Sequence, residues 1–318
     1  MVEAGKTLHF IKTALGLLKT ERCTFETCRM HQKMNQTQAR TRFKEHFGQA
    51  NHLLITSIVA LHTLENSAVT AAPPELHTSW NPQSKINSIQ RTRNFILHTA
   101  LSSAVDSLDM YIALLYRKPN YIRNNAVASK LDAAGRSVAR KIAVIAEHYA
   151  PPVEVVALVE VLVTWRNNVV HELADNTVAP EAKVVLLKNA ERIAEDFRGL
   201  DVTMLASKAE AGDALTFKET TSLINAAHKF VQHVDQAVIN RLDLKALCRE
   251  LIAEAVLAEK DNRNFSLKYF SLPEAGRTQC VTNWLASNYG IVNLTEDQLA
   301  ECLIVRRPVP EKANPRAK

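Results

Sequence analysis

Apolar side chains recur every three to four residues along most of this chain, and prolines and polar clusters interrupt the pattern. This spacing places apolar side chains on one face of a helix. It predicts helices over residues 43–64, 86–116, 131–149, 153–171, 180–197, 217–240 and 242–260. A short amphipathic helix is expected over residues 8–19, and two short helices within 273–304, around Tyr289 and Gly290. Thr295 would cap the second of these two.

Two segments depart from the amphipathic pattern. Residues 153–163 are apolar on every side except at Glu154 and Glu160, which is typical of a helix buried at the centre of a domain. Residues 66–86 contain three prolines among Ser, Thr and Asn, and therefore predict a long loop.

Composition supports a mostly helical fold. The 318 residues suit two domains, or one domain with extensions, and apolar residues make up 47% of them, enough for a sizeable core. Only 8 are glycine, and neither GxGxxG nor GxxxxGK[ST] occurs, which argues against a β-sandwich, a Rossmann fold or a P-loop enzyme. The sequence therefore predicts an all-α protein.

Positive charge is concentrated at the two ends of the chain. The net charge is +6, yet residues 1–44 carry +6 and residues 305–318 carry +4, which leaves −4 on the residues between them. Basic ends of this kind often contact polyanions such as nucleic acid, although the C-terminal one is equally well read as a solvated tail.

Cysteines and apolar runs indicate the compartment. Five cysteines in so long a chain do not form a disulfide framework, which favours a reducing cytoplasm. The first twenty residues make a poor signal peptide because lysines interrupt their apolar run, and no apolar stretch is long enough to span a membrane. Cys23, Cys28 and His31 invite a zinc interpretation, but no fourth ligand is evident, so no metal or other cofactor is expected.

Candidate chemistry lies where the apolar helix ends, in the stretch Leu-Val-Thr-Trp-Arg-Asn-Asn-Val-Val-His over residues 162–171. Arg166 offers a permanent cation with a planar fork that fits phosphate oxygens, and His171 can exchange a proton near neutral pH. Asn167 can hydrogen-bond phosphate, sugar or the imidazole ring. Together these groups could cleave RNA by activating a ribose 2′-OH and stabilising the phosphorane.

Arg166 and His171 can act together only under a geometric condition. Residues five apart on a helix point about 140° apart, so the two side chains converge only if the helix ends or distorts there, or if a second copy completes the pocket. Arg93 and His98 have the same spacing, but His98 falls near an apolar stripe and is better read as a packed histidine. For Arg166 and His171 the simpler interpretation is a cationic helix C-terminus.

The Arg-Asn-x-x-x-His stretch resembles the signature of the HEPN superfamily, all-helical domains found in prokaryotic defence systems, toxins and eukaryotic proteins. Residues 97–109 look like an early helix of that family carrying an acidic residue. Asp106 and Asp109 lie one turn apart on that helix, where they either support the site by orienting a catalytic histidine or arginine or form a solvated edge. The resemblance covers roughly residues 42–200.

The resemblance implies an up-down helical bundle, a homodimer whose two Arg/His sets face one cleft, and metal-independent endoribonuclease activity. It makes Arg166 and His171 the catalytic pair, with Asn167 beside them, and suggests a toxin or anti-phage effector with a neutralising or activating protein partner. The expected organisation is a basic segment over 1–41, the bundle over 42–200, additional C-terminal helices over 201–304 and a basic tail over 305–318.

Two other functions stay open on the sequence. In the first, the bundle binds nucleotides or a protein partner without catalysis. In the second, the protein is a DNA-binding regulator that uses residues 273–304, although few Lys or Arg residues lie on the segment that would read the duplex.

Overall fold

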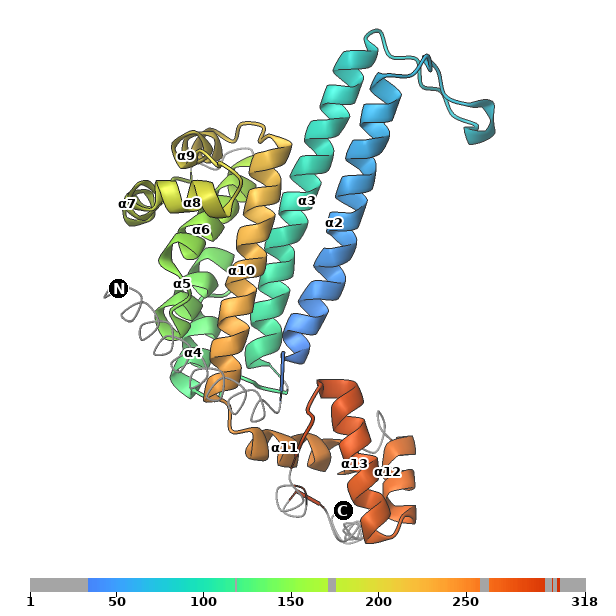
Figure 1. The fold of residues 1–318 in the computed structure, drawn as a ribbon, viewed down its shortest axis with the longest axis vertical. Coiled ribbons are helices and arrows are strands. Elements are labelled where there is room, and N and C mark those ends of the chain that lie inside the picture. Colours follow the sequence, from blue (N-terminus) through green and yellow to red (C-terminus); the bar gives the residue numbers. More distant parts are fainter. Residues whose placement is uncertain are drawn as a thin grey trace, which may run out of the picture. The chain divides into compact units, whose positions relative to one another are not determined.

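The described part of the protein is helical. The computed structural model describes residues 34–117, 119–170, 176–257, 263–294, 299 and 302–303 (Figure 1). Within those ranges the chain forms helices joined by turns and loops, with one isolated bridge between Met34 and Ile291 and no β-strand. The prediction of an all-α protein is confirmed.

The helices follow the order α2 (Gln38–Glu65), the 3₁₀ turn η1 (Pro74–Leu76), α3 (Lys85–Tyr116), α4 (Asn125–Ala133), α5 (Val138–Tyr149), α6 (Val153–Val170), α7 (Pro180–Lys188), α8 (Ala190–Asp196), α9 (Val202–Ala211), α10 (Phe217–Arg241), α11 (Leu244–Leu257), α12 (Arg263–Ser271) and α13 (Glu274–Tyr289). None of these helices is long and apolar enough to cross a membrane.

The chain divides into two compact units. Residues 36–242 form the larger unit, and residues 1–35 together with 243–318 form the smaller one. In the smaller unit, α11, α12 and α13 bury a core that includes Leu251, Tyr269 and Leu285, and the bridge between Met34 and Ile291 lies in the same unit.

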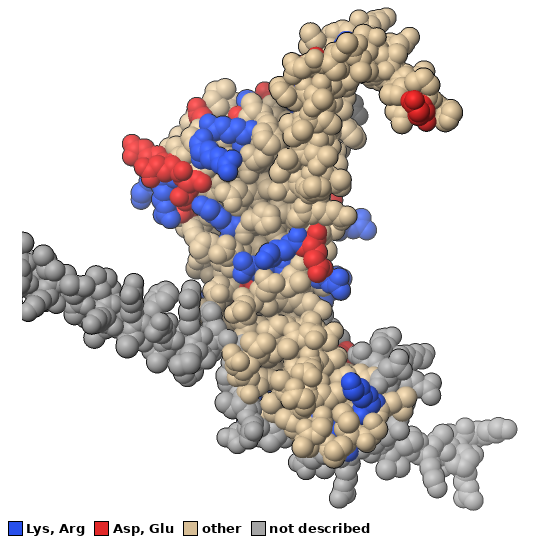
Figure 2. All heavy atoms as spheres, turned by 45° about the vertical axis from the view of Figure 1, so that its right-hand side comes forward, with Lys and Arg blue, Asp and Glu red and all other residues tan. Residues whose placement is uncertain are grey.

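The larger unit is built around three mutually packed helices, α3, α6 and α10. Helix α2 runs back along α3 as a long hairpin, α5 packs against α3 and α6, and α7 and α9 cover α6 (Figure 1). The end of the hairpin where α2 and α3 are connected is nearly free of charge on the face drawn in Figure 2. Residues 46–84 contain only two charged side chains, Glu65 and Glu75.

Helix α6 is buried on almost every side, as its apolar sequence predicts. Val159, Leu162 and Trp165 are fully buried. The two glutamates that interrupt its apolar run both have partners: Glu154 forms an ion pair of 2.9 Å with Arg192, and Glu160 accepts a hydrogen bond of 2.8 Å from the backbone of Ala179. Paired in this way, the carboxylates fit a buried helix because burial of an unpaired charge is costly.

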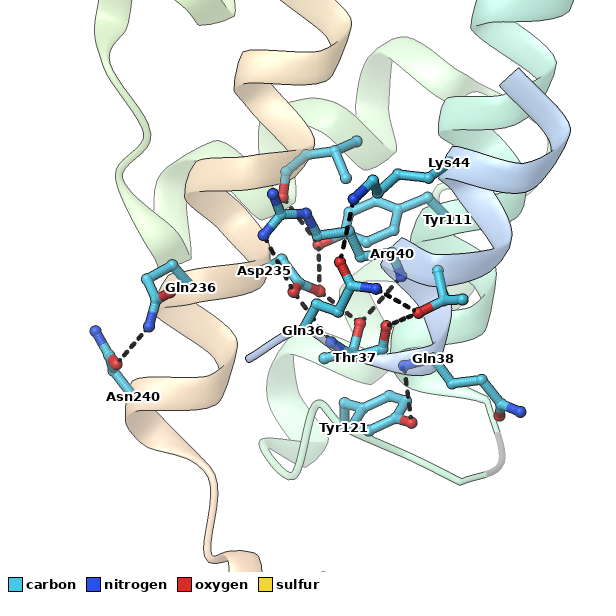
Figure 3. Close-up of polar contacts among 12 residues, drawn as sticks. Gln36, Thr37, Gln38, Arg40, Lys44, Tyr111, Tyr121, Asp235, Gln236 and Asn240 are labelled. Atoms are coloured by element: carbon cyan, nitrogen blue, oxygen red, sulfur yellow. Dashed lines mark hydrogen bonds and ion pairs between the residues drawn. The ribbon is translucent and has the colours of Figure 1, made fainter. Parts of the chain in front are cut away.

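A buried carboxylate joins the start of α2 to α10. Asp235 has no exposed surface, and it accepts hydrogen bonds from the Thr37 backbone and hydroxyl and from the Tyr111 hydroxyl (Figure 3). The Thr37 hydroxyl also caps α2 by accepting from the Arg40 backbone. Burial raises the pKa of Asp235, while the Thr37 bonds and the Arg40 charge act against that rise. This network fixes where α2 begins on the bundle.

Several predicted helices differ in detail from the observed ones. The helix expected over 131–149 is two helices, α4 and α5, separated by a turn at Gly135, whose φ of 58° suits glycine. The helix expected over 180–197 breaks at Asn189 into α7 and α8. Helices α9 and α12 lie in segments where the hydrophobic pattern predicted none. The expected boundary near residue 200 falls instead at Leu242, because α9 and α10 pack against α6.

Some expectations concern residues outside the described ranges. These are the helix over 8–19, the Cys23–Cys28–His31 cluster, the Thr295 cap, most of the basic N-terminal segment and the basic tail over 305–318. Cys248, Cys280 and Cys302 lie in the described part of the chain and form no disulfide there.

Candidate functional site

The candidate site lies at the C-terminal end of α6, where the buried helix reaches the surface. Trp165 is fully buried, and its indole nitrogen donates to the Asp213 carbonyl at 2.9 Å. The next residue, Arg166, keeps 24% of its side chain exposed. The helix therefore presents a guanidinium at the edge of the bundle, directly after a fully buried and hydrogen-bonded indole.

Arg166 is only partly satisfied by its neighbours. One guanidinium nitrogen lies 3.5 Å from a carboxylate oxygen of Asp106 on α3, and another donates to the Asn167 side chain at 3.3 Å. The Asp106 side chain is 65% exposed, so this long ion pair is weak. The buried Nε of Arg166 has no hydrogen-bond partner among the described residues. Within the described residues, the guanidinium therefore has two long contacts at its terminal nitrogens and one buried N–H group without an acceptor.

The structure brings together some of the predicted site residues and separates others. Arg166 contacts both Asn167 and Asp106. Asp109, one turn further along α3, instead forms an ion pair of 2.6 Å with Lys141 of α5, whose side chain is 8% exposed. His171 follows α6 directly and lies outside the described residues.

The second pair of the same spacing has a structural role. Arg93 forms an ion pair of 3.2 Å with Glu65, which links the two helices of the α2–α3 hairpin. The His98 ring packs edge-on against Trp165 at 4.9 Å, and its buried Nε2 has no hydrogen-bond partner in the described part of the chain. Burial lowers the pKa of His98, so the neutral ring is favoured. The interpretation of His98 as a packed histidine fits this geometry.

Asn168 is a site residue that sequence reasoning did not single out. Its amide nitrogen lies within hydrogen-bond distance of three carbonyl oxygens, those of Asn176 at 2.8 Å, Ala209 at 3.1 Å and Glu210 at 3.2 Å. Its carbonyl oxygen accepts from the backbone and the side chain of Asn176 at 2.9 and 3.0 Å. We call this set of bonds the asparagine clamp. It fixes residue 176 to the end of α6 and to the last turn of α9.

The clamp joins the end of α6 to residue 176, which precedes α7. Beyond it, the Val178 backbone donates to Glu210 at 2.9 Å, and Glu210 forms an ion pair of 2.6 Å with Lys183. The Lys183 and Val178 bonds hold the pKa of Glu210 below its usual value. Gly212, with φ of 67°, ends α9 beside Asn168. Both ends of the segment that carries His171 are therefore fixed by hydrogen bonds.

The described residues contain no group of three or more His, Cys, Asp and Glu side chains placed to hold a metal ion. In comparisons with known proteins, no family model, no curated protein and no solved structure matches the chain.

Proposed function

We propose that this protein is a metal-independent endoribonuclease of the HEPN type. The observation that carries the proposal is the partly satisfied guanidinium of Arg166, presented by a buried helix at the edge of an all-helical bundle. Arginine in such a setting suits a phosphate group, whose oxygens are acceptors that the described residues do not provide. The Arg-Asn-x-x-x-His spacing supplies a histidine five residues further on.

The reaction we propose is attack of a ribose 2′-oxygen on the adjacent phosphorus. His171 takes the proton of the 2′-OH or gives one to the departing 5′-oxygen, and Arg166 stabilises the charge that builds on the phosphorane. The products are a 2′,3′-cyclic phosphate and a 5′-hydroxyl. Asn167, already within hydrogen-bond distance of the Arg166 guanidinium, orients that group.

In this proposal the protein acts as a homodimer in the cytoplasm, as a toxin or anti-phage effector under the control of a protein partner. A second copy would bring two Arg/His sets to one cleft, which also satisfies the angular condition set by the spacing. The asparagine clamp supports the proposal because it fixes both ends of the segment that carries His171.

The test is RNA cleavage in EDTA by the wild type, Arg166→Ala and His171→Ala, with the product ends mapped. Arg93→Ala and His98→Ala are matched controls, because they remove a pair of the same spacing. We expect the first two variants to lose at least a hundredfold in rate and the controls to keep it. If folded Arg166→Ala and His171→Ala proteins cleave as fast as the wild type, the proposal is wrong.

Two other functions have distinct outcomes in the same experiment. RNA or nucleotide binding that survives His171→Ala, with no cleavage by the wild type, would favour a non-catalytic binding module. Salt-dependent duplex binding that is lost on deletion of α12 and α13 would favour the DNA-binding alternative. In α13, Arg277 lies over the rings of Tyr269 and Phe270 and donates to the Leu272 carbonyl, so intramolecular contacts already engage this cation.

A further inference from the structure

A separate cleft of about 520 Å³ lies between α2, the end of α8 and α10. Its volume falls within the range of about 300–1,000 Å³ that is usual for small-molecule sites. Phe217, Thr221, Asn225 and His228 line it from α10, where they share one face because they follow at intervals of three or four residues. It shares no residue with the Arg166 site.

Four polar side chains that line the cleft make no hydrogen bond within the described part of the chain. They are the amides of Asn51 and Asn225, the guanidinium of Arg198 and the imidazole of His228. The hydroxyls nearby are engaged: that of Thr221 donates to the Lys218 carbonyl and that of Ser222 to the Phe197 carbonyl. The cleft thus offers hydrogen-bonding capacity of its own to a ligand.

The His228 ring is held in a fixed position. It packs against Phe47 at 4.9 Å and edge-on against Phe43 at 5.3 Å. Burial lowers its pKa, and the charges of Lys44 and Arg40 lower it further. The ring is therefore neutral near pH 7 and offers one donor and one acceptor.

The charge of the cleft favours an anion. Asp196 is the only carboxylate among the residues that line it, and an ion pair of 3.0 Å with Lys229 balances its charge. Arg198 has no such partner in the described part of the chain. Its φ of 58° lies in the left-handed region, which is uncommon for a residue with a side chain.

The cleft also has an apolar side suited to a flat ring. Phe217 in the first turn of α10 is 40% exposed, and Ile55 of α2 is 47% exposed. An exposed phenyl ring can stack on a nucleobase. Asparagine amides match the paired donor and acceptor on the edge of adenine.

We propose that this cleft binds an adenine nucleotide, with the base between Phe217 and Ile55, its edge on Asn51 and Asn225, and the phosphate on Arg198. The nucleotide is either a free mononucleotide or one unit of an RNA strand, because both present the same base and phosphate.

Titration calorimetry on the full chain tests this assignment, with AMP and adenosine as ligands. A charge-assisted contact with the phosphate should make AMP bind about tenfold more tightly than adenosine. Arg198→Asn removes the cation while keeping a residue that tolerates positive φ, and should abolish that tenfold difference. Asn225→Ala should weaken both ligands about tenfold. Arg136→Asn, in the exposed turn between α4 and α5, is the matched control and should bind both as the wild type does.

A hexamer of adenylate distinguishes the two sources, measured with His171→Ala so that the strand is not cut. Binding of the hexamer but not of AMP, with the same dependence on Arg198 and Asn225, would identify the ligand as part of an RNA strand. The assignment is overturned if neither AMP nor the hexamer binds, if AMP binds but no more tightly than adenosine, or if Arg198→Asn and Asn225→Ala leave the affinity of the ligand that binds unchanged. His171→Ala is expected to bind AMP normally, so failure of the ribonuclease proposal would not affect this result.

Discussion

The asparagine clamp makes the sharpest prediction on stability. In Asn168→Ala the Asn176 backbone loses its acceptor, and the carbonyl oxygens of Asn176, Ala209 and Glu210 lose a donor. The substitution also removes the bond from the Asn176 side chain. We expect this one change to loosen the connection between α6, α9 and the chain leading to α7.

The magnitude follows from counting hydrogen bonds that can exist together. The amide of Asn168 has two hydrogens for three nearby carbonyl oxygens, and its own oxygen accepts two bonds, so about four bonds are lost. Each contributes about 0.5–1.5 kcal/mol net, and some groups regain water in the variant. We therefore expect Asn168→Ala to lower the free energy of unfolding by about 3 kcal/mol.

The assay is urea denaturation followed by circular dichroism, with Asn167→Ala as the control. Asn167 lies on the same helix and undergoes the same chemical change, but within the described residues its side chain makes a single hydrogen bond, of 3.3 Å, with Arg166. We expect the control to lose less than about 0.5 kcal/mol. If Asn168→Ala costs no more than Asn167→Ala, the clamp does not stabilise the fold and the reasoning is refuted.

Three further changes have defined outcomes. Asp109→Asn should cost about 2 kcal/mol because it leaves the buried Lys141 ammonium unpaired, whereas Asp106→Asn should cost less than about 0.5 kcal/mol; equal losses in urea melts would contradict this assignment. His98→Phe should make the free energy of unfolding depend less on pH below about pH 6.5. The pKa of His98 is lowered in the folded state, so the wild type loses stability as pH falls and the unfolded chain takes up a proton. An unchanged slope of stability against pH in the variant would contradict this reasoning. Thr37→Ala should lower stability by about 2 kcal/mol and Ser84→Ala, an exposed cap on α3, by about 1 kcal/mol or less; the reverse order would show that the Asp235 contacts contribute little.

Periodicity predicted the long helices because each has one clear apolar face or is apolar throughout. Helices α2, α3, α6 and α10 match the expected ranges closely. The helices that were predicted wrongly lie where the hydrophobic pattern is short or continues across a break. Gly135 interrupts an apolar pattern that continues across it, and α9, only ten residues long, starts at an Asp201 cap whose importance depends on packing against α6.

The candidate site was predicted as a set of residue types rather than as a geometry. Sequence spacing placed Arg166 and Asn167 together because they are neighbours on one helix. It could not show that Asp109 pairs with Lys141, since that contact depends on where α5 lies. Nor could it show that Asn168 reaches the end of α9, 41 residues away. The cleft lined by Arg198 and His228 was missed for the same reason, because three helices meet there only after folding.

The buried Asp235 has a consequence for the order of folding. Its bonds with Thr37 join residues 198 positions apart, whereas α2 and α3 are neighbours in the chain and can pair early. Closing so long a loop is entropically costly, and contacts of this range tend to form after the transition state. Weakening the carboxylate should then speed unfolding much more than it slows folding. The buried carboxylate would thus set how long the folded bundle persists, with little influence on how fast it assembles.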